Sequence, residues 1–272
     1  MRILRWIVGV AFIITTALFV VVYVGEKMTT DDTVPVITVE DEIIEVGFNA
    51  NDEELLQGIT AYDEKDKDLT DKVIVESVSK FIEPGVCKVV YAVCDNDNNV
   101  ANATRKIKYK NYESPKFFVH ESLCYSIYDR INISEAITAE DCIDGDISRS
   151  IIVTSDDFAG SVAGVFNIDI SVINSKGDTS MLKLPLVIED RSLSAPTIKL
   201  SEYLVYAEKG KEIDFSSFIV SIETKKEEEI PLKSVRIETN ANVSEEGVYS
   251  VHYYVTDSTG AQGHSILNVI VG

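Results

Sequence analysis

The chain has 272 residues, of which 45 are acidic and 25 are basic, so its formal net charge at neutral pH is −20. This charge excludes nucleic acid as an expected partner, because binding a phosphate backbone requires clustered lysine and arginine. The hydrophobic fraction of 45%, with 12 Tyr and 10 Phe, is too high for a disordered chain. The composition therefore predicts a folded, acidic protein.

An uncharged run of 19 residues, Trp6 to Val24, lies near the N-terminus. As a helix it would be ~28 Å long, close to the ~30 Å hydrocarbon core of a bilayer. Two arginines and no acidic residue precede the run, so the positive-inside rule predicts a cytoplasmic N-terminus. We expect a single-pass cell-membrane protein with a cytoplasmic tail over residues 1–5, a transmembrane anchor over 6–25 and a linker over 26–33.

Two other interpretations of this segment were weighed. A cleaved signal peptide usually has an apolar region of about 7–15 residues and small residues before the cleavage site. This run is longer, and its exit from Tyr23 to Glu26 has no such site. A buried core helix is disfavoured because nothing else in the chain is helical enough to cover it.

The remainder of the chain contains three copies of one unit. Each copy opens with a proline-led strand, at Pro35, Pro115 and Pro196. A Gly-Val pair later begins a long strand, and an Asp or Asn ends that strand ten residues after the glycine. These pairs are Gly85 and Asp95, Gly164 and Asn174, and Gly247 and Asp257. We therefore expect modules over 34–111, 113–190 and 195–272.

The long strand of each copy alternates apolar and other side chains, which is typical of an antiparallel strand with one buried face. Turn-forming residues follow it, and a second alternating strand closes the unit. Short strands separated by turns predict a β-sandwich. The side chains expected to point inward are Cys87, Val89, Tyr91 and Val93 in the first copy, Phe166, Ile168, Ile170 and, after a slip, Ile173 in the second, and Tyr249, Val251, Tyr253 and Val255 in the third.

An acidic motif precedes the long strand in the first two copies, and the third copy has the segment 223–229 in its place. The motif contains Asp63, Asp66, Asp68 and Asp71 in the first copy, and Asp141, Asp144, Gly145 and Asp146 in the second. Together with the prolines and the Gly-Val hairpins, it resembles the immunoglobulin-like repeats of bacterial surface proteins, a type also appended to some pesticidal crystal proteins and similar to hyalin repeats. The resemblance covers nearly all of the chain that follows the predicted membrane anchor. It implies an all-β fold, with three tandem immunoglobulin-like β-sandwiches behind one N-terminal transmembrane helix.

Because such repeats serve as spacers, adhesins and carbohydrate binders alike, the resemblance says little about activity. We expect a non-catalytic, membrane-anchored cell-surface protein of a Gram-positive bacterium. Its modules would act as a stalk and as an adhesion surface for an extracellular protein or glycan. One alternative is an accessory subunit of a cell-envelope enzyme or polysaccharide-export assembly. Another is a carbohydrate-binding module, which is disfavoured because the single tryptophan, Trp6, lies in the membrane segment.

An enzyme is not expected, because the chain has no nucleophile elbow, zinc-protease, P-loop or dinucleotide motif. The three histidines, His120, His252 and His264, read as isolated residues on surfaces or edge strands. Cys87 and Cys94 lie ~23 Å apart on one strand and cannot form a disulfide there. A disulfide between Cys124 and Cys142 is left open.

The acidic motifs are the candidate ligand sites, and two interpretations of them stay open. Carboxylates at spacings of two or three residues can converge on calcium, which prefers six to eight oxygen ligands. Alternatively, they cap backbone N–H groups in a solvated turn. The calcium interpretation assigns the metal to Asp63, Asp66, Asp68, Asp141, Asp144 and Asp146, and no other cofactor is expected.

The acidic loops also suggest how the modules join. In an immunoglobulin-like topology the loop over 141–146 should lie at the junction with the first module, near Lys110, Tyr112 and Glu113. The loop over 63–71 and the turn over 95–99 should lie together at the membrane side of the first module. The third module lacks the motif, so we expect a flexible junction before it.

Overall fold

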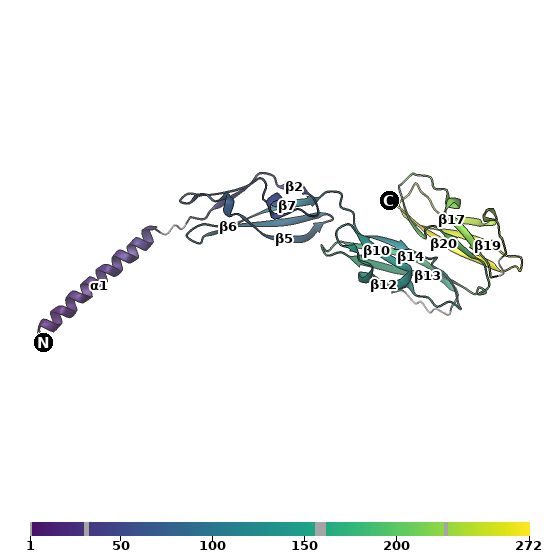
Figure 1. Cartoon of the computed structure of the whole chain (residues 1–272), viewed down its shortest axis with the longest axis horizontal. Helices are drawn as coiled ribbons and strands as arrows, with labels where there is room; N and C mark the ends of the chain where they lie inside the picture. The colour runs from purple at the N-terminus through teal and green to yellow at the C-terminus, as the bar shows by residue number, and fades with distance from the viewer. Residues whose placement is uncertain (1, 30–32, 156–161, 226–227) are drawn as a thin grey trace. The chain divides into compact units, whose positions relative to one another are not determined.

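The computed structural model describes residues 2–29, 33–155, 162–225 and 228–272. An N-terminal helix is followed by strands in several sheets (Figure 1), which confirms the predicted all-β fold class with one apolar helix. The chain divides into two compact units, Met1–Asn111 and Tyr112–Gly272.

Helix α1 (Arg2–Thr29) extends beyond the uncharged run at both ends. Its stretch Trp6–Gly25 has a mean hydropathy of 2.7, and none of its most apolar window is buried. By length and composition this helix could cross a membrane, although a signal sequence would meet the same criteria. The predicted linker over 26–33 is helical at its start, and its residues 30–32 lie outside the described residues.

The first unit contains the first sandwich, whose two sheets face each other. In both sheets neighbouring strands are antiparallel, except that β2 runs parallel to β7. The sheets are ordered β1-β3-β4 and β2-β7-β6-β5. The elements are β1 (Val36–Val39), β2 (Ile43–Val46), α2 (Asp52–Leu55), β3 (Ile59–Asp63), β4 (Lys67–Asp68), η1 (Thr70–Lys72), β5 (Ile74–Glu83), β6 (Val86–Cys94) and β7 (Val100–Tyr109).

The second unit contains the second and third sandwiches. The second has sheets β8-β10-β11 and β12-β13-β14-β9, and the third has β15-β17 and β16-β20-β19-β18. Its first elements are β8 (Lys116–Val119), β9 (Cys124–Ser126), α3 (Ile133–Ala136), β10 (Ile137–Asp141), β11 (Gly145–Asp146), η2 (Ser148–Ser150), β12 (Ile152–Ser155), β13 (Gly164–Ile173) and β14 (Thr179–Glu189). The others are β15 (Thr197–Leu200), β16 (Leu204–Ala207), η3 (Phe215–Phe218), β17 (Ile219–Glu223), η4 (Leu232–Ser234), β18 (Arg236–Thr239), β19 (Gly247–Thr256) and β20 (Gln262–Val271).

The order of the four-stranded sheet repeats in all three sandwiches. It includes an early strand that runs parallel to the last one, as β2 does to β7, β9 to β14 and β16 to β20. The described strands of each sandwich lie within one predicted module. The module limits at 34–111, 113–190 and 195–272 stay predictions.

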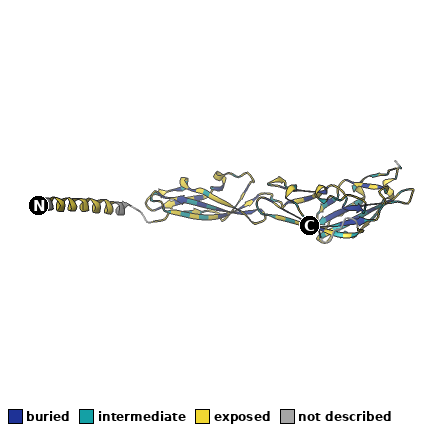
Figure 2. Cartoon of the chain, turned by 90° about the horizontal axis from the view of Figure 1, so that it is seen from below, coloured by how far each residue is buried: buried dark blue, intermediate teal, exposed yellow. Residues whose placement is uncertain are grey.

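Buried and exposed residues alternate along the long strands (Figure 2). The expected inward faces of β6 and β19 are confirmed, with Tyr91 and Tyr253 fully buried. In β13 the predicted slip is wrong, because Val172 is buried and Ile173 is 49% exposed. The strand pairs with β14 without a register shift over its whole length, so the alternation continues to its end.

The turns after the long strands, which the turn-forming residues predict, each contain a residue with left-handed backbone. Asn98, Gly177 and Gly260 have φ angles of 69°, 87° and 86°, and each is the third residue after the Asp or Asn that ends the strand. Asparagine and glycine are the residues that adopt this conformation most readily.

The second and third sandwiches pack against each other, so the predicted flexible junction between them is wrong. Ile266 of β20 is fully buried against Cys124 and Val187 of the second sandwich. The backbone N–H of Ile266 donates to Ser122 Oγ (2.9 Å). The Phe117 N–H donates to the hydroxyl of Tyr206 in β16 (3.0 Å). The outer face of the β16-β20-β19-β18 sheet therefore supplies part of this junction.

Candidate functional site

The acidic motif of the first sandwich forms the turn between β3 and β4. Asp63 is buried at the end of β3, and its Oδ1 accepts from the N–H groups of Lys65 (2.8 Å) and Asp66 (2.9 Å). Its Oδ2 accepts from the hydroxyl of Thr33 (3.3 Å), just before β1. Asp68 Oδ1 accepts from the N–H of Thr70 (3.0 Å) and begins η1. Each carboxylate therefore orders the backbone that follows it.

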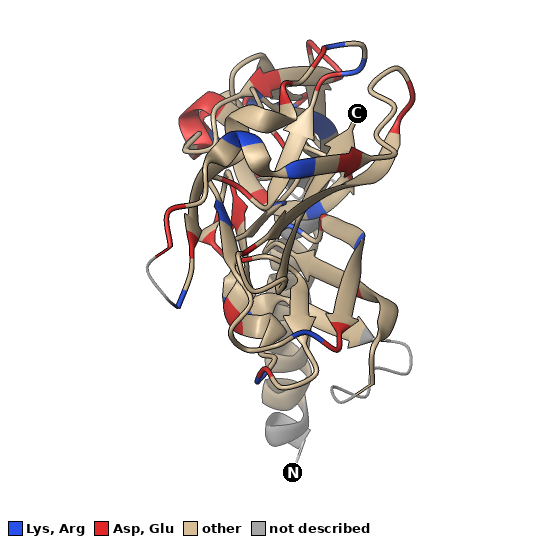
Figure 3. Cartoon of the chain, turned by 90° about the vertical axis from the view of Figure 1, so that its right-hand side faces the viewer, with Lys and Arg blue, Asp and Glu red and all other residues tan. Residues whose placement is uncertain are grey.

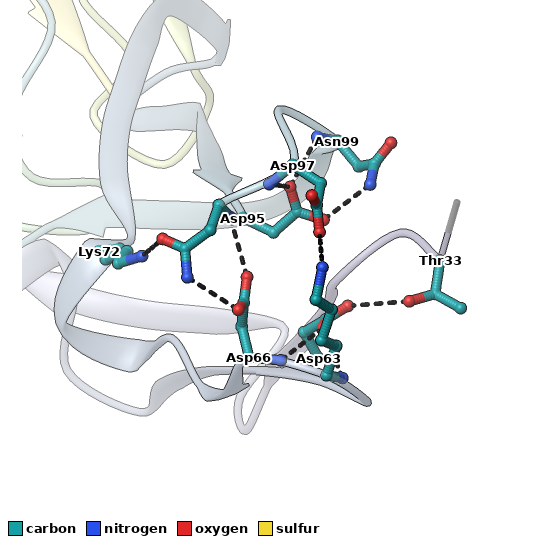
Figure 4. Close-up of polar contacts among 9 residues, drawn as sticks. Thr33, Asp63, Asp66, Lys72, Asp95, Asp97 and Asn99 are labelled. Carbon is teal, nitrogen blue, oxygen red and sulfur yellow. Dashed lines mark hydrogen bonds and ion pairs between the residues drawn. The ribbon is translucent and has the colours of Figure 1, made fainter. Parts of the chain in front are cut away.

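The neighbouring turn after β6 meets this motif, as predicted (Figure 4). The two oxygens of Asp66 accept from the backbone N–H (2.8 Å) and side-chain amide (2.7 Å) of Asn96. Asp95 accepts from the N–H groups of Asp97 and Asn99, both at 2.8 Å. Lys65 forms an ion pair with Asp97. The carboxylates thus point at nitrogen donors and, in one case, at an ammonium group.

The second sandwich repeats the backbone-capping contacts of the first acidic motif. Asp141 Oδ1 accepts from the N–H groups of Ile143 (2.9 Å) and Asp144 (3.0 Å). Asp144 accepts from the N–H (2.6 Å) and hydroxyl (2.7 Å) of Ser175, and Asp146 caps η2 through the N–H of Ser148 (2.9 Å). The pattern therefore belongs to the fold and not to one copy of it.

Two of the expected neighbours of the second acidic motif, Tyr112 and Glu113, are confirmed. The Cys142 thiol donates to the carbonyl of Glu113 (3.2 Å). The side-chain amide of Asn174 donates both to the Tyr112 hydroxyl (2.9 Å) and to Asp141 Oδ2 (3.1 Å). The loop is thus held to the start of the second unit.

Hydrogen bonding shifts the acidity of several of these groups. The Asp66 N–H lowers the pKa of Asp63 below its usual range against the effect of burial. The hydroxyls of Thr70 and Ser148 similarly lower the pKa of Asp68 and of Asp146. For Asp95, burial acts to raise the pKa, but the hydrogen bonds from Asn99 and Asp97 together lower it. The carboxylates are therefore stabilised as anions by the protein's own donors.

This geometry favours the capped-turn interpretation of the acidic motifs, and the calcium interpretation stays a prediction. Acidic residues occur on many connecting segments of the chain (Figure 3). Among the described residues, neither motif brings three carboxylates to within 4.8 Å of one another. That criterion is met elsewhere, by Cys124, Glu189 and His264.

Sequence reasoning missed this second group, which lies between the second and third sandwiches. His264 Nδ1 is 2.7 Å from Glu189 Oε1 and 3.1 Å from Cys124 Sγ, and its Nε2 is 2.9 Å from His252 Nδ1. His264 is buried and His252 half-buried, so the interpretation of these two histidines as isolated surface residues is wrong. His120 is exposed, with Nε2 2.7 Å from Thr138 Oγ1.

Burial and neighbouring charges also shift the groups at this junction. Burial, followed by the charge of Glu189, raises the pKa of the Cys124 thiol to about 12. The hydrogen bond with His264 lowers the pKa of Glu189. Burial, followed by the charge of His264, lowers the pKa of His252.

The open question of a disulfide is resolved by this geometry. Cys124 and Cys142 are free thiols, the first buried and the second exposed. They belong to opposite sheets of the second sandwich, since Cys124 lies in β9 and Cys142 follows β10.

A signal for the junction was present in the sequence of β20. Its outward positions hold His264, Ile266, Asn268 and Ile270, of which two are aliphatic, whereas a strand with one face in water normally carries polar side chains there. The apolar residues on both faces of β20 therefore indicated a second contact surface.

Comparison with known proteins supports the resemblance seen in the sequence. Residues 38–108 match the family described as "Bacterial surface protein, Ig-like domain". A relative, an uncharacterized 81.3 kDa protein of Acholeplasma phage L2, is 27% identical over 139 residues, which are 50% of this chain and 18% of the relative. The chain thus spans less than a fifth of that relative's length.

Several solved structures are also similar to this chain. The CBM51-2 and INT domains of Clostridium perfringens ZmpB, in complex with GlcNAc, are 22% identical over 54% of this chain and 26% of that one, with a TM-score of 0.23. The lipoprotein BT2262 of Bacteroides thetaiotaomicron is 14% identical over 86% of this chain and 98% of that one, with a TM-score of 0.22. Drosophila N-cadherin EC1-4 is 10% identical over 89% of this chain and 76% of that one, with a TM-score of 0.25.

Proposed function

We propose that this chain, whose residues 38–108 form a bacterial surface immunoglobulin-like domain, is a non-catalytic cell-surface protein held in the membrane by α1. Its sandwiches would serve as a stalk and as a binding surface outside a Gram-positive cell, for an extracellular protein or glycan. The membrane would be a partner only through residues 6–25.

The observation that carries this proposal is the contrast between α1 and the sandwiches. The apolar stretch Trp6–Gly25 has no buried residues in its most apolar window. Each sandwich, by contrast, buries its own apolar side chains between two sheets. An apolar helix that the protein does not cover is stabilised by a bilayer, because every lipid-facing side chain is then removed from water.

The anchor is tested by fractionating cells that express the full chain. We expect the protein to stay with membranes after alkaline extraction, and N-terminal sequencing to begin at Met1. Ile14→Asp should shift the chain to the soluble fraction, because an acidic residue at the centre of a membrane helix costs about 2.5–3.5 kcal/mol. Ile14→Leu is the matched control and should behave as the unmodified chain. An N-terminus near Glu26 would show a cleaved signal sequence.

The orientation and the binding role need a second experiment, on intact cells. Protease added outside should remove the sandwiches and reduce adhesion of the expressing cells to cells or glycan-coated beads. Cells that express Ile14→Asp should lack this adhesion. Sandwiches that resist the protease on intact cells, yet are cut after lysis, would contradict the proposed orientation. Cross-links between the sandwiches and an envelope enzyme would instead favour the role of an accessory subunit.

A further inference from the structure

Three side chains with different ligand atoms converge at the junction of the second and third sandwiches. Cys124 comes from β9, Glu189 from the end of β14 and His264 from β20. Their sulfur, oxygen and nitrogen atoms lie within 4.8 Å of one another. Cys124 and His264 are buried, at 5% and 6% exposure. Pairing of β9 with β14 brings Cys124 close to Glu189, and packing of the third sandwich on the second adds His264. These three residues are termed the junction cluster.

The arrangement is not that of a nucleophile with its catalytic base. In such a triad the cysteine and the acid contact opposite nitrogens of the histidine, so that the acid orients the ring while the base takes the thiol proton. Here both Cys124 Sγ and Glu189 Oε1 lie on the same nitrogen, His264 Nδ1. Three atoms with lone pairs therefore face one point in space.

We propose that the junction cluster is a zinc site that fastens the second sandwich to the third. Thiolate sulfur, imidazole nitrogen and carboxylate oxygen are the ligands that Zn²⁺ takes in proteins, and calcium and magnesium take oxygen ligands instead. Three protein ligands leave a fourth position for water. The proposal concerns the junction alone and stands apart from the proposed surface function.

The far side of the His264 ring is built to hold it in the required orientation. When Nδ1 binds a metal, Nε2 carries the proton, and His252 Nδ1 lies 2.9 Å away to accept it. Tyr254 stacks on the His264 ring with centroids 4.3 Å apart and an interplanar angle of 19°. A hydrogen-bonded outer partner of this kind fixes the tautomer and direction of a ligating histidine.

The local charges are balanced when zinc is present. The Cys124 thiolate and the Glu189 carboxylate together neutralise the two charges of the ion. The guanidinium of Arg191 donates to the carbonyls of His264 (2.8 Å) and Cys124 (3.2 Å), and its positive charge lies close enough to act on both Cys124 and Glu189. Binding releases the thiol proton of Cys124, as metal ligation by cysteine requires.

The cluster also has a route to solvent. Glu189 is 33% exposed at its side chain. It lines a surface hollow of about 460 Å³ together with Arg191, Ser192, Ala261 and Gln262. An ion can enter there, and the fourth ligand position can hold water from the same side.

The test uses the full chain, reduced and held in detergent, with Co²⁺ as a spectroscopic substitute for Zn²⁺. We expect a thiolate-to-cobalt charge-transfer absorption that Zn²⁺ displaces, and an increase in the melting temperature of the second unit with Zn²⁺. Cys124→Ser should abolish the absorption. Cys142→Ser, which removes an exposed thiol of the same sandwich, should leave it unchanged and is the matched control.

Two further variants separate ligation from folding. Glu189→Gln keeps the shape of the side chain and should weaken Zn²⁺ binding with a native circular dichroism spectrum. His252→Phe should weaken it by about 10–100-fold, as loss of an outer partner of a ligating histidine does. The proposal is overturned if the reduced, unmodified chain shows no charge-transfer absorption, or if the absorption survives Cys124→Ser and disappears in Cys142→Ser.

Discussion

Strands β7 and β20 occupy the same place in the first and third sandwiches, but their outer faces differ. On β7 the outward Thr104, Lys106 and Lys108 are exposed. At the matching positions of β20, Ile266 and Asn268 are fully buried and Ile270 is half-buried. The inner faces of both strands close a sandwich core. The side chains on the outer face of a repeated strand therefore differ according to whether another sandwich packs against that face.

The comparison also extends to the inner face. Arg105 of β7 is 2% exposed and donates to the carbonyl of Gln57 (2.7 Å) and to the hydroxyl of Tyr91 (3.1 Å). Leu267 of β20 occupies the position that matches Arg105, and its side chain has no polar atom that needs a hydrogen-bond partner. The first sandwich therefore carries a buried charged network where the third has an apolar core.

The outer faces are compared most directly by truncating one side chain on each. Ile266→Ala should destabilise the second unit by about 2–5 kcal/mol, because it leaves a cavity between Cys124 and Val187. Thr104→Ala, at the matching exposed position, should change stability by less than about 0.5 kcal/mol. Denaturant unfolding of both variants measures this, and similar effects would contradict the assigned junction.

The inner faces differ in how much a buried tyrosine hydroxyl contributes to the stability of its sandwich. Tyr91→Phe should destabilise by about 1.5–3 kcal/mol, because the Tyr91 hydroxyl donates to the carbonyl of Leu55 (2.7 Å) and accepts from the charged Arg105. Tyr253→Phe removes one bond, to the carbonyl of Phe215 (2.9 Å), and should cost about 1 kcal/mol. Chemical denaturation of the two variants measures both losses of stability. Equal losses would contradict the prediction that Tyr91→Phe is the more destabilising change.

Thiol labelling sharpens the distinction between a sandwich core and a junction. In native conditions Cys94 and Cys142 should react quickly and Cys87 and Cys124 slowly, following their exposure. As denaturant is added, Cys124 should react before Cys87, because separating two sandwiches requires less opening than unfolding one. Mass spectrometry of labelled peptides reports the order, and earlier reaction of Cys87 would contradict it.

Acid should affect the first sandwich through its capped turn. The pKa values of Asp63 and Asp95 are lower in the folded protein than the value of 3.8 expected in the unfolded chain. Both carboxylates therefore stabilise the fold at pH values above 3.8, and this stabilisation is lost as the pH falls through the folded pKa. Asp95→Asn imitates Asn174 of the second sandwich and should reduce the loss of stability below about pH 4. Thermal melts of the variant and the unmodified chain from pH 6 to pH 2 test this. An unchanged pH dependence would show that Asp95 is not stabilised as an anion.

Local structure followed from the sequence because it depends on neighbours in the chain. The two-residue period of the long strands placed Tyr91 and Tyr253 inside, and the spacing of Asp63, Asp66 and Asp68 matched a turn that these side chains cap. The expected slip at Ile173 was wrong because an unbroken ladder with β14 overrode a local choice between two adjacent apolar residues.

The junction was decided only by the tertiary structure. Cys124 and His264 are separated by 140 positions in the chain, so no spacing rule connects them. Alternation determines which side chains share a face of a strand, but it does not determine whether water or another sandwich lies against that face. His252 and His264 were therefore interpreted as isolated, whereas packing of the third sandwich on the second buries His264 beside a thiol and a carboxylate.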